Sequence, residues 1–208
     1  MGVFYESLEN PECKLAIWKT EETTGELCQL LGISGSELPA RVESRQKEWL
    51  TIRILVKKLL SLKGIPLIDY DEKGKPSLKD SEYSISISHS KEFVGVILSG
   101  SQSCGIDLEI IHPRIKKIAA RFLMEDEKQF MDEKLALNYL YVIWGAKEVL
   151  YKLHGKGNIL FKEHLKVEPF IFESEGKVTA HILKENYSKT YSIYYRQIEN
   201  VMLTYAVE

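Results

Sequence analysis

Apolar residues recur at helical spacing in two long stretches of the chain. The first covers residues 41–63, where Trp49 lies on the apolar face and Gly64 supplies a stop signal. The second covers residues 132–154 and is followed by Gly155. The pattern therefore predicts two long helices, one in each half of the chain.

Short apolar runs and alternating apolar and polar residues predict strands around these helices. Thr20 and Gly32 bound a shorter predicted helix, residues 114–122 form a basic one, and the polar residues 173–176 predict a hairpin turn. The predicted strands cover residues 13–19, 67–70, 83–88, 93–98, 105–111, 191–196 and 201–207.

Each half of the chain thus combines one long helix with several strands, and a small polar linker, residues 99–103, lies near the midpoint. This arrangement predicts an α+β fold of two similar lobes related by a pseudo-two-fold axis. Each lobe is expected to be a small, mostly antiparallel sheet packed on a long helix. We expect the lobes to cover residues 1–103 and 104–208.

Composition and charge exclude several classes of function. Among 208 residues, 28 Lys and Arg stand against 30 Asp and Glu, so no broad electrostatic attraction to nucleic acid or to an anionic membrane is expected. The three cysteines form no Cys-x-x-Cys pair, which is typical of a reducing compartment. No basic region followed by an apolar run opens the chain, and we expect a cytoplasmic protein without a signal peptide or a membrane span.

Asp107 and Glu109 lie among apolar residues in one predicted strand. Because side chains alternate along a strand, both carboxylates project from one face, about 6–7 Å apart. Such a pair is half of a site for a hard cation. The alternative is a half-exposed strand whose acids face water.

A stripe on the second long helix carries a further acid. Trp144, Glu148 and Lys152 recur every four residues and share one face. A stripe that carries Trp tends to face inward, where a Glu needs a partner or a metal. The alternative is an amphipathic helix with an ordinary Glu148–Lys152 surface pair.

Several residues in the first half could donate hydrogen bonds to a phosphate. Lys75 lies in a predicted turn, Ser88 and His89 end a predicted strand, and Arg41 and Arg45 are four residues apart on the first long helix. The alternative for Lys75 is that it is simply solvated, and the alternative for Ser88 and His89 is local hydrogen bonding at the strand end. The two arginines would then lie on a solvated helix face.

Four short motifs stand in an order that resembles a known family. They are GKP at 74–76, ISHS at 87–90, GIDLE at 105–109 and WGAKEVLYK at 144–152. The order resembles the 4′-phosphopantetheinyl transferases over roughly residues 41–157, and more closely the Sfp-like branch than the smaller, trimeric holo-ACP synthases. Cys104, Gly145 and Val149 depart from the residues usual in that family, and the last two could alter how the helix packs.

The resemblance implies an enzyme that transfers 4′-phosphopantetheine from coenzyme A to a serine of an apo acyl or peptidyl carrier protein and releases adenosine 3′,5′-bisphosphate. It also implies Mg²⁺ as the cofactor, with Mn²⁺ left open, and a monomer. The balanced charge and the lack of a long apolar stretch predict that neither nucleic acid nor a membrane is a partner. The alternatives are a non-catalytic protein that binds coenzyme A or the carrier protein, and a purely structural α+β protein.

Carried over by motif, the expected metal ligands are Asp107, Glu109 and Glu148, with Glu109 binding directly or through water. Glu148 is expected to accept the proton of the carrier serine, and Lys147 and Lys152 to contact the pyrophosphate and the leaving group. The expected catalytic set is Glu148, Lys152 and Asp107. The second lobe would thus hold the metal site and the carrier contacts.

The first lobe is expected to bind phosphates of coenzyme A, with His89 on the 3′-phosphate. Arg41 and Arg53 are alternatives to Arg45 in this role. The full set of expected contacts in this lobe is Arg45, Lys75, Ser88 and His89.

An apolar segment follows the predicted basic helix. Phe122, Leu123 and Met124 stand next to several Lys and Arg residues, a combination that suits an acidic carrier helix. We hypothesise that these three residues contact the carrier protein. The alternative is that they are ordinary core residues.

Overall fold

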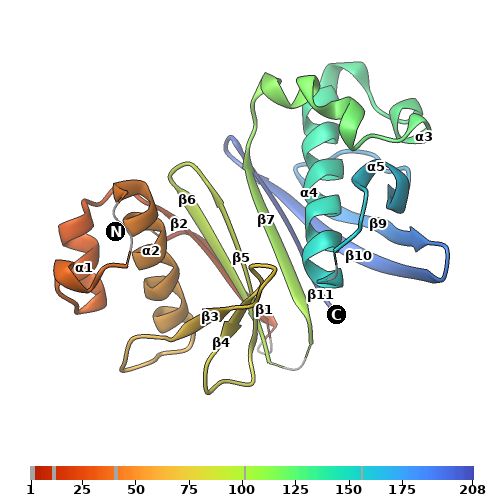
Figure 1. Ribbon diagram of the computed structural model, residues 1–208. Coiled ribbons are helices and arrows are strands. Elements are labelled where there is room, and N and C mark those ends of the chain that lie inside the picture. The colour runs from red at the N-terminus through yellow and green to blue at the C-terminus, as the bar shows by residue number, and fades with distance from the viewer. Residues whose placement is uncertain (1–2, 11–12, 40–41, 101, 156) are drawn as a thin grey trace. The chain divides into compact units, whose positions relative to one another are not determined.

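The chain forms two compact units, unit 1 (Met1–Gln102) and unit 2 (Ser103–Glu208). The computed structural model describes residues 3–10, 13–39, 42–100, 102–155 and 157–208. Each unit contains helices and antiparallel strands, which confirms the predicted α+β class (Figure 1). The pseudo-two-fold relation and the division of roles between the lobes stay predictions. Two residues named above are outside the described residues: Arg41, with which the first long helix was expected to begin, and Ser101 of the expected linker.

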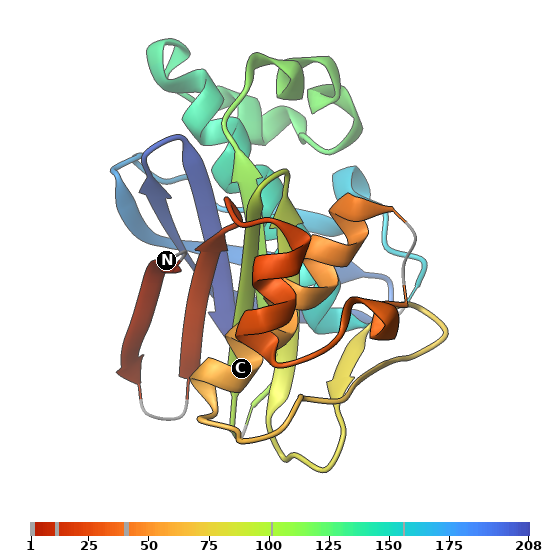
Figure 2. The same cartoon turned by 90° about the vertical axis from the view of Figure 1, so that its left-hand side faces the viewer.

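Unit 1 is an antiparallel sheet covered by a helix. Its strands are β1 (Val3–Asn10), β2 (Cys13–Lys19), β3 (Ile68–Tyr70), β4 (Pro76–Leu78), β5 (Ser84–Ser90) and β6 (Phe93–Ser99). The sheet order is β1-β2-β6-β5, and β3 and β4 form a separate hairpin. Helix α2 (Glu43–Leu59) packs on β2 and β6, and α1 (Thr24–Leu31) packs on α2 (Figures 1 and 2). Leu27, Leu55 and Val96 from these layers meet in the core.

Helix α1 begins at Thr24, directly after its N-cap residue Thr23. Thr23 accepts a hydrogen bond from the Glu26 N–H, and the Glu26 carboxylate accepts one from the Thr23 N–H, which makes a capping box. The predicted cap at Thr20 is therefore wrong. The predicted stop at Gly32 is confirmed, because Gly32 has a φ of 83° that few other residues adopt without strain.

Helix α2 ends four residues earlier than expected. The Leu62 N–H donates to the Lys57 carbonyl oxygen at 2.9 Å, and the Ser61 N–H donates to the Lys58 carbonyl oxygen at 3.1 Å. With Ser61 at a φ of 52°, these bonds form a Schellman ending. Ser61 thus takes the position that the sequence pattern assigned to Gly64.

Unit 2 is a second antiparallel sheet packed on a long helix. Its strands are β7 (Cys104–Ile110), β8 (Leu165–Val167), β9 (Glu175–Lys184), β10 (Tyr187–Ile198) and β11 (Val201–Val207). They lie in the order β7-β11-β10-β9-β8. Helix α4 (Ala136–His154) packs on β7 and β11 (Figure 1) and ends before Gly155, which has a φ of 62°. A 3-10 turn, Glu133–Leu135, replaces the first residues of the longer helix that was expected.

The segment between β7 and α4 differs from the prediction. The predicted basic helix is wrong, because the backbone forms two 3-10 turns, Pro113–Lys117 and Ala119–Arg121, instead. The Ile118 N–H donates to the Ile115 carbonyl oxygen three residues earlier, at 3.0 Å.

Two short helices, α3 (Glu125–Gln129) and α5 (Phe161–His164), were not predicted, because a single turn leaves no periodic pattern. Among the described helices, none combines the length and the apolar character needed to cross a membrane.

The predicted hairpin turn at 173–176 is wrong. Gly176 lies inside β9, and the turn between β9 and β10 falls at residues 185–186. Gly176 pairs with Tyr195, and a Cβ at Gly176 would lie 2.8 Å from the Tyr195 hydroxyl oxygen. The glycine is therefore needed for the close approach of a ring across the strands, not for a turn.

Candidate active site

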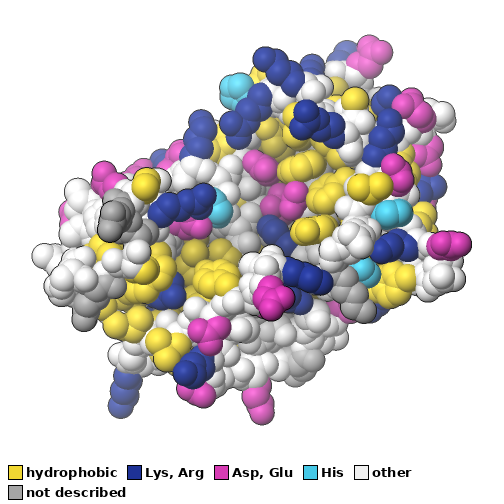
Figure 3. Space-filling view, viewed as in Figure 1, with side chains coloured by type: hydrophobic (Ala, Val, Ile, Leu, Met, Phe, Trp, Pro, Cys, Tyr) yellow, Lys and Arg dark blue, Asp and Glu magenta, His cyan; other side chains and the backbone are white. Residues whose placement is uncertain are grey.

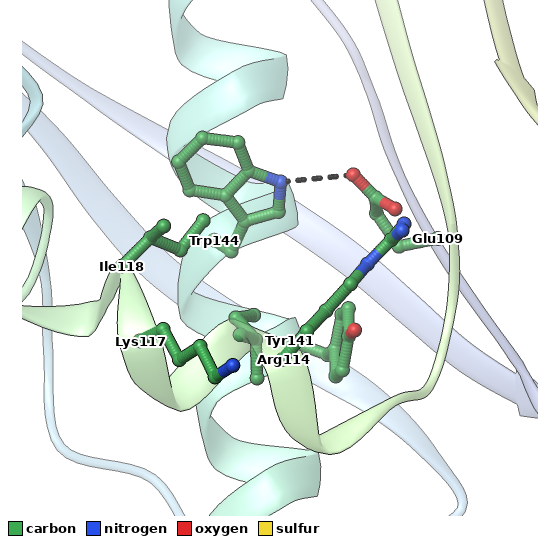
Figure 4. Close-up of a pocket in the computed structure, with 7 residues that line it drawn as sticks. Glu109, Arg114, Lys117, Ile118, Tyr141 and Trp144 are labelled. Atoms are coloured by element: carbon green, nitrogen blue, oxygen red, sulfur yellow. Dashed lines mark hydrogen bonds between the residues drawn. The ribbon is translucent and has the colours of Figure 1, made fainter.

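Asp107 and Glu109 of β7 both reach the helix that covers their strand. The Lys152 ammonium donates hydrogen bonds to Asp107 Oδ1 at 3.0 Å and to the Ile106 carbonyl oxygen at 2.6 Å. The Trp144 indole N–H donates to Glu109 Oε1 at 3.2 Å (Figure 4). The predicted helix stripe and the predicted acidic strand face therefore lie against each other in unit 2.

Glu148 stands on the same stripe, between Trp144 and Lys152, and its acid–base behaviour is altered. Burial raises the pKa of Glu148 to about 7, and the charge of Asp107 adds to this shift. Lys152 lowers the pKa, and Glu109 raises it further. A carboxyl group with a pKa near neutrality can accept a proton at physiological pH, as a general base must.

These carboxylates offer the oxygen ligands that Mg²⁺ prefers, although they are not gathered around one point. Across the described parts of the chain, no group of three or more His, Cys, Asp or Glu side chains is arranged to hold a metal ion. Asp107 is bound to Lys152, and Glu109 is bound to Trp144. Because Mg²⁺ commonly takes only one or two carboxylates, with waters and substrate phosphates completing its shell, the donor set fits this ion.

Lys147 lies in the core of unit 2, although it stands next to Glu148 in the sequence. Its fully buried ammonium donates to Glu127 Oε2 at 2.8 Å and to the Phe122 carbonyl oxygen at 2.6 Å. Burial lowers the pKa of Lys147, and the charge of Glu127 opposes that shift. Successive helix residues point about 100° apart, so Lys147 and Glu148 cannot both face β7. We therefore withdraw the expected pyrophosphate contact through Lys147, which instead ties α4 to the preceding segment.

In unit 1, Arg45 and His89 meet at an open pocket of about 470 Å³. Arg45 Nη1 lies 3.4 Å from His89 Nε2 and 2.6 Å from Glu48 Oε2. Glu48 Oε1 lies 3.3 Å from His89 Nδ1. Lys47 and Lys91 also line this pocket. The pocket thus gathers several N–H donors that suit an anionic ligand.

Three other candidates for phosphate contacts lie apart from this pocket. Ser88 is 7% exposed and faces the opposite side of β5 from His89, because neighbouring side chains alternate along a strand. Among the described residues, neither Ser88 nor the exposed Lys75 lines the pocket, so the grouping of Ser88 with His89 is wrong and the role of Lys75 stays a prediction. The third candidate, Arg53, is 6% exposed and stacks 3.7 Å from the centre of the Trp49 ring.

The apolar segment 122–124 is not the surface that we expected. Phe122 and Leu123 are almost fully buried in the core of unit 2, so a carrier contact through them is wrong. The ring of Phe122 instead supports Trp144, with 5.1 Å between the ring centres.

A pocket of about 420 Å³ opens beside Trp144 (Figure 4). On the surface of unit 2 around the 3-10 turns and α4, Lys and Arg side chains surround hydrophobic ones (Figure 3). An apolar floor with a basic rim suits an amphipathic, acidic partner. The lining residues are Glu109, Arg114, Ile115, Lys117, Ile118, Tyr141 and Trp144.

Two acidic residues of these sites were missed in the sequence. Glu48 follows Arg45 by three residues, a spacing typical of helical ion pairs, and this signal could have identified it. Glu127 accepts hydrogen bonds from the Met124 and Val167 N–H groups as well as from Lys147. No sequence signal distinguishes Glu127 from the exposed acids beside it.

Comparisons with known proteins identify one family, and its family model matches unit 2. Residues 103–206 match the family model of the 4′-phosphopantetheinyl transferase superfamily. The chain is 31% identical over 129 residues to 4′-phosphopantetheinyl transferase Sfp of Bacillus subtilis (strain 168), a match that covers 59% of this chain and 56% of the relative. It is 29% identical over 121 residues to 4′-phosphopantetheinyl transferase AcpT of Salmonella typhimurium, covering 53% of this chain and 60% of the relative. The chain thus spans little more than half the length of these relatives.

Proposed function

The chain belongs to the 4′-phosphopantetheinyl transferase superfamily, and we propose that it transfers 4′-phosphopantetheine from coenzyme A to a serine of an apo acyl or peptidyl carrier protein. The observation that carries this proposal is the cluster of Asp107, Glu109, Glu148 and Lys152, where one carboxyl group has a pKa of about 7. A phosphoryl transfer of this kind needs positioning, charge neutralisation and a base more than it needs a nucleophile of its own.

Glu148 is the proposed general base. The serine oxygen of the carrier forms a bond to the phosphorus that bears pantetheine, and its proton passes to the Glu148 carboxylate. The bond from this phosphorus to the bridging oxygen breaks, and adenosine 3′,5′-bisphosphate leaves with the electron pair. Lys152 is proposed to stabilise the negative charge of the departing phosphate, since its ammonium already faces this cluster.

Asp107, Glu109 and Glu148 are the carboxylates from which a divalent cation, in the first place Mg²⁺, would take one or two ligands. When bound, this ion supplies charge neutralisation for the pyrophosphate. Burial is the main cause of the raised pKa of Glu148, and the charges of Asp107 and Glu109 add to it; a bound cation would relieve this repulsion.

Arg45 and His89 are the proposed contacts for the 3′-phosphate of coenzyme A. Their side-chain nitrogens lie 3.4 Å apart in a pocket that Lys47 and Lys91 also line. Charged N–H donors form short, strong hydrogen bonds to phosphate oxygens.

The basic and apolar pocket beside Trp144 is the proposed contact for the carrier protein, in place of the buried residues Phe122 and Leu123. Arg114 and Lys117 supply the positive charge, and Ile118 supplies apolar surface. A cytoplasmic location and a monomeric state stay predictions.

The experiment that tests the proposal is incubation of the protein with coenzyme A, Mg²⁺ and a panel of apo carrier proteins, read by intact-protein mass. We expect one carrier to gain a single phosphopantetheine group. We expect Asp107→Ala and Glu148→Ala to abolish the gain while thermal unfolding remains cooperative. Binding of coenzyme A without a mass gain on any carrier would contradict transfer and favour a non-catalytic binding protein.

A further inference from the structure

One carboxylate in unit 1 holds both cationic groups of the pocket. Glu48 Oε2 accepts a hydrogen bond from Arg45 Nη1 at 2.6 Å, and Glu48 Oε1 lies 3.3 Å from His89 Nδ1. Each oxygen of Glu48 therefore serves a different partner. The Glu48 side chain is only 22% exposed, whereas that of His89 is 46% exposed and that of Arg45 is 62% exposed. The more buried group thus orients the two more exposed ones.

The contact with Glu48 decides which nitrogen of His89 faces a ligand. A carboxylate can only accept a hydrogen bond, so its contact with Nδ1 is favourable when Nδ1 carries a proton. The two ring nitrogens point away from each other, and Nε2 remains on the side of Arg45. With Nδ1 donating to Glu48, the ring presents Nε2 to the pocket, and Nε2 donates to an anion there when the ring carries both protons.

Arg45 retains donors after it binds Glu48. A guanidinium carries several N–H groups in a planar fork, and only one nitrogen of Arg45 is bound to the carboxylate. Lys47 and Lys91 supply further positive charge at the pocket, and the carboxylates that line it are those of Glu48 and Glu92. An anion can therefore reach Arg45 and His89 Nε2 without displacing Glu48.

We propose that Glu48 is a positioning residue for the 3′-phosphate of coenzyme A, because it fixes Arg45 and His89 so that their remaining donors converge on that phosphate. The proposal rests on the proposed function for the identity of the ligand. It assigns to Glu48 a role in selecting coenzyme A over dephospho-coenzyme A, which lacks only the 3′-phosphate. Glu48 does not touch the reacting phosphorus, so it affects binding and not the chemical step.

The test compares the two ligands with the full chain and three variants, Glu48→Ala, Glu48→Gln and Glu43→Ala. For Glu48→Ala, we expect the preference for coenzyme A over dephospho-coenzyme A to fall about tenfold. The loss should appear as a higher KM for coenzyme A, with kcat unchanged. Glu48→Gln keeps one acceptor oxygen, which can hold Arg45 or His89 but not both, and should restore only part of the preference. Glu43 is exposed on the first turn of α2, where its carboxylate lies 3.5 Å from the Lys47 ammonium. Glu43→Ala therefore removes one negative charge near the pocket without touching Arg45 or His89, and should not lower the preference.

Three outcomes overturn the proposal. An unchanged preference in Glu48→Ala means that Glu48 does not position the donors. A stronger preference means that its charge merely repels the phosphate. An equal loss of affinity for both ligands, with a lowered melting temperature, means that Glu48 only supports the fold.

Other outcomes would contradict the proposed function and can be told apart from a failure of the role of Glu48. If the wild-type protein binds both ligands equally, the 3′-phosphate contact through Arg45 and His89 is wrong, and the role of Glu48 is overturned with it. If the preference and its loss in Glu48→Ala are observed by direct binding but no carrier gains mass, transfer is wrong and the positioning role is supported.

Discussion

Glu148 shows how a single side chain can acquire a functional pKa from its surroundings. Burial and the charge of Asp107 raise this pKa to about 7, while Lys152 on the next turn of the helix lowers it. The result is a carboxyl group that changes its charge near neutral pH, where most carboxyl groups stay ionised. The same shift makes the stability of the protein depend on pH.

We predict that the metal-free protein loses stability as the pH rises from about 4.5 through about 7. The folded state holds a proton on Glu148 in this range and the unfolded state does not, so the proton stabilises the fold at low pH only. The loss is at most about 3.5 kcal/mol, from about 1.4 kcal/mol per pKa unit. Urea unfolding in EDTA, near pH 5 and near pH 8, measures it. Glu148→Gln should flatten this dependence, and an unchanged slope in that variant would contradict the assignment.

The buried Lys147–Glu127 pair leads to a second prediction. Lys147→Met leaves the carboxylate of Glu127 buried without its cation, and we expect a loss of about 3–5 kcal/mol in the free energy of unfolding. The double variant Lys147→Met, Glu127→Leu removes both charges and should recover part of this loss. Urea unfolding of the two variants measures the difference. A mild effect of Lys147→Met on stability, with a large effect on the KM for coenzyme A, would instead restore Lys147 as a phosphate contact.

Residue neighbours explain which parts of the site could be predicted from the sequence. The four-residue spacing of Trp144, Glu148 and Lys152 placed them on one helix face, and β7 lies against that face. Lys147 and Ser88 were grouped with a functional neighbour through a sequence motif, but the geometry of a helix or a strand points adjacent side chains in different directions. A sequence motif shows which residues are neighbours along the chain, whereas the backbone conformation determines which of their side chains can contact the same ligand.

At the scale of elements, close packing of α4 on its sheet depends on two glycines. A Cβ at Gly105 of β7 would lie 3.0 Å from the Val149 carbonyl oxygen. A Cβ at Gly145 of α4 would lie 2.3 Å from Thr204 Oγ1 on β11. Thr204 pairs with Asp107 across the strands, so this approach brings α4 down beside the acidic cluster. The sequence predicted the helix and both strands, but no local pattern could indicate how closely they approach.

The contact between Gly145 and Thr204 gives a third prediction. Gly145→Ala forces the new methyl group against the Thr204 hydroxyl, and we expect it to lower the free energy of unfolding by about 1–3 kcal/mol. Thr204→Ala removes the opposing atoms, so the double variant should be more stable than Gly145→Ala alone. Urea unfolding of the two single variants and the double variant measures the coupling. Strictly additive effects would mean that the two side chains do not meet.

At the scale of the whole molecule, the two units carry different parts of the proposed chemistry. The N–H donors of Arg45 and His89 belong to unit 1, and the carboxylates of Asp107 and Glu148 belong to unit 2. The family model matches residues 103–206, which lie in unit 2. The part proposed for unit 1 therefore depends on the geometry of its own pocket.

We predict that Mg²⁺ binding to the full chain, measured by calorimetry with coenzyme A present, becomes tighter as the pH rises towards about 7. Glu148 must release its proton to coordinate the ion, so the affinity should increase by up to about tenfold per pH unit below the pKa, and protons should be released. Glu148→Gln removes the charged ligand and should weaken binding while abolishing this proton release. Glu163→Gln, an exposed change on α5, is the matched control and should leave both quantities unchanged. Binding to Glu148→Gln with wild-type affinity and proton release would show that the metal is held elsewhere.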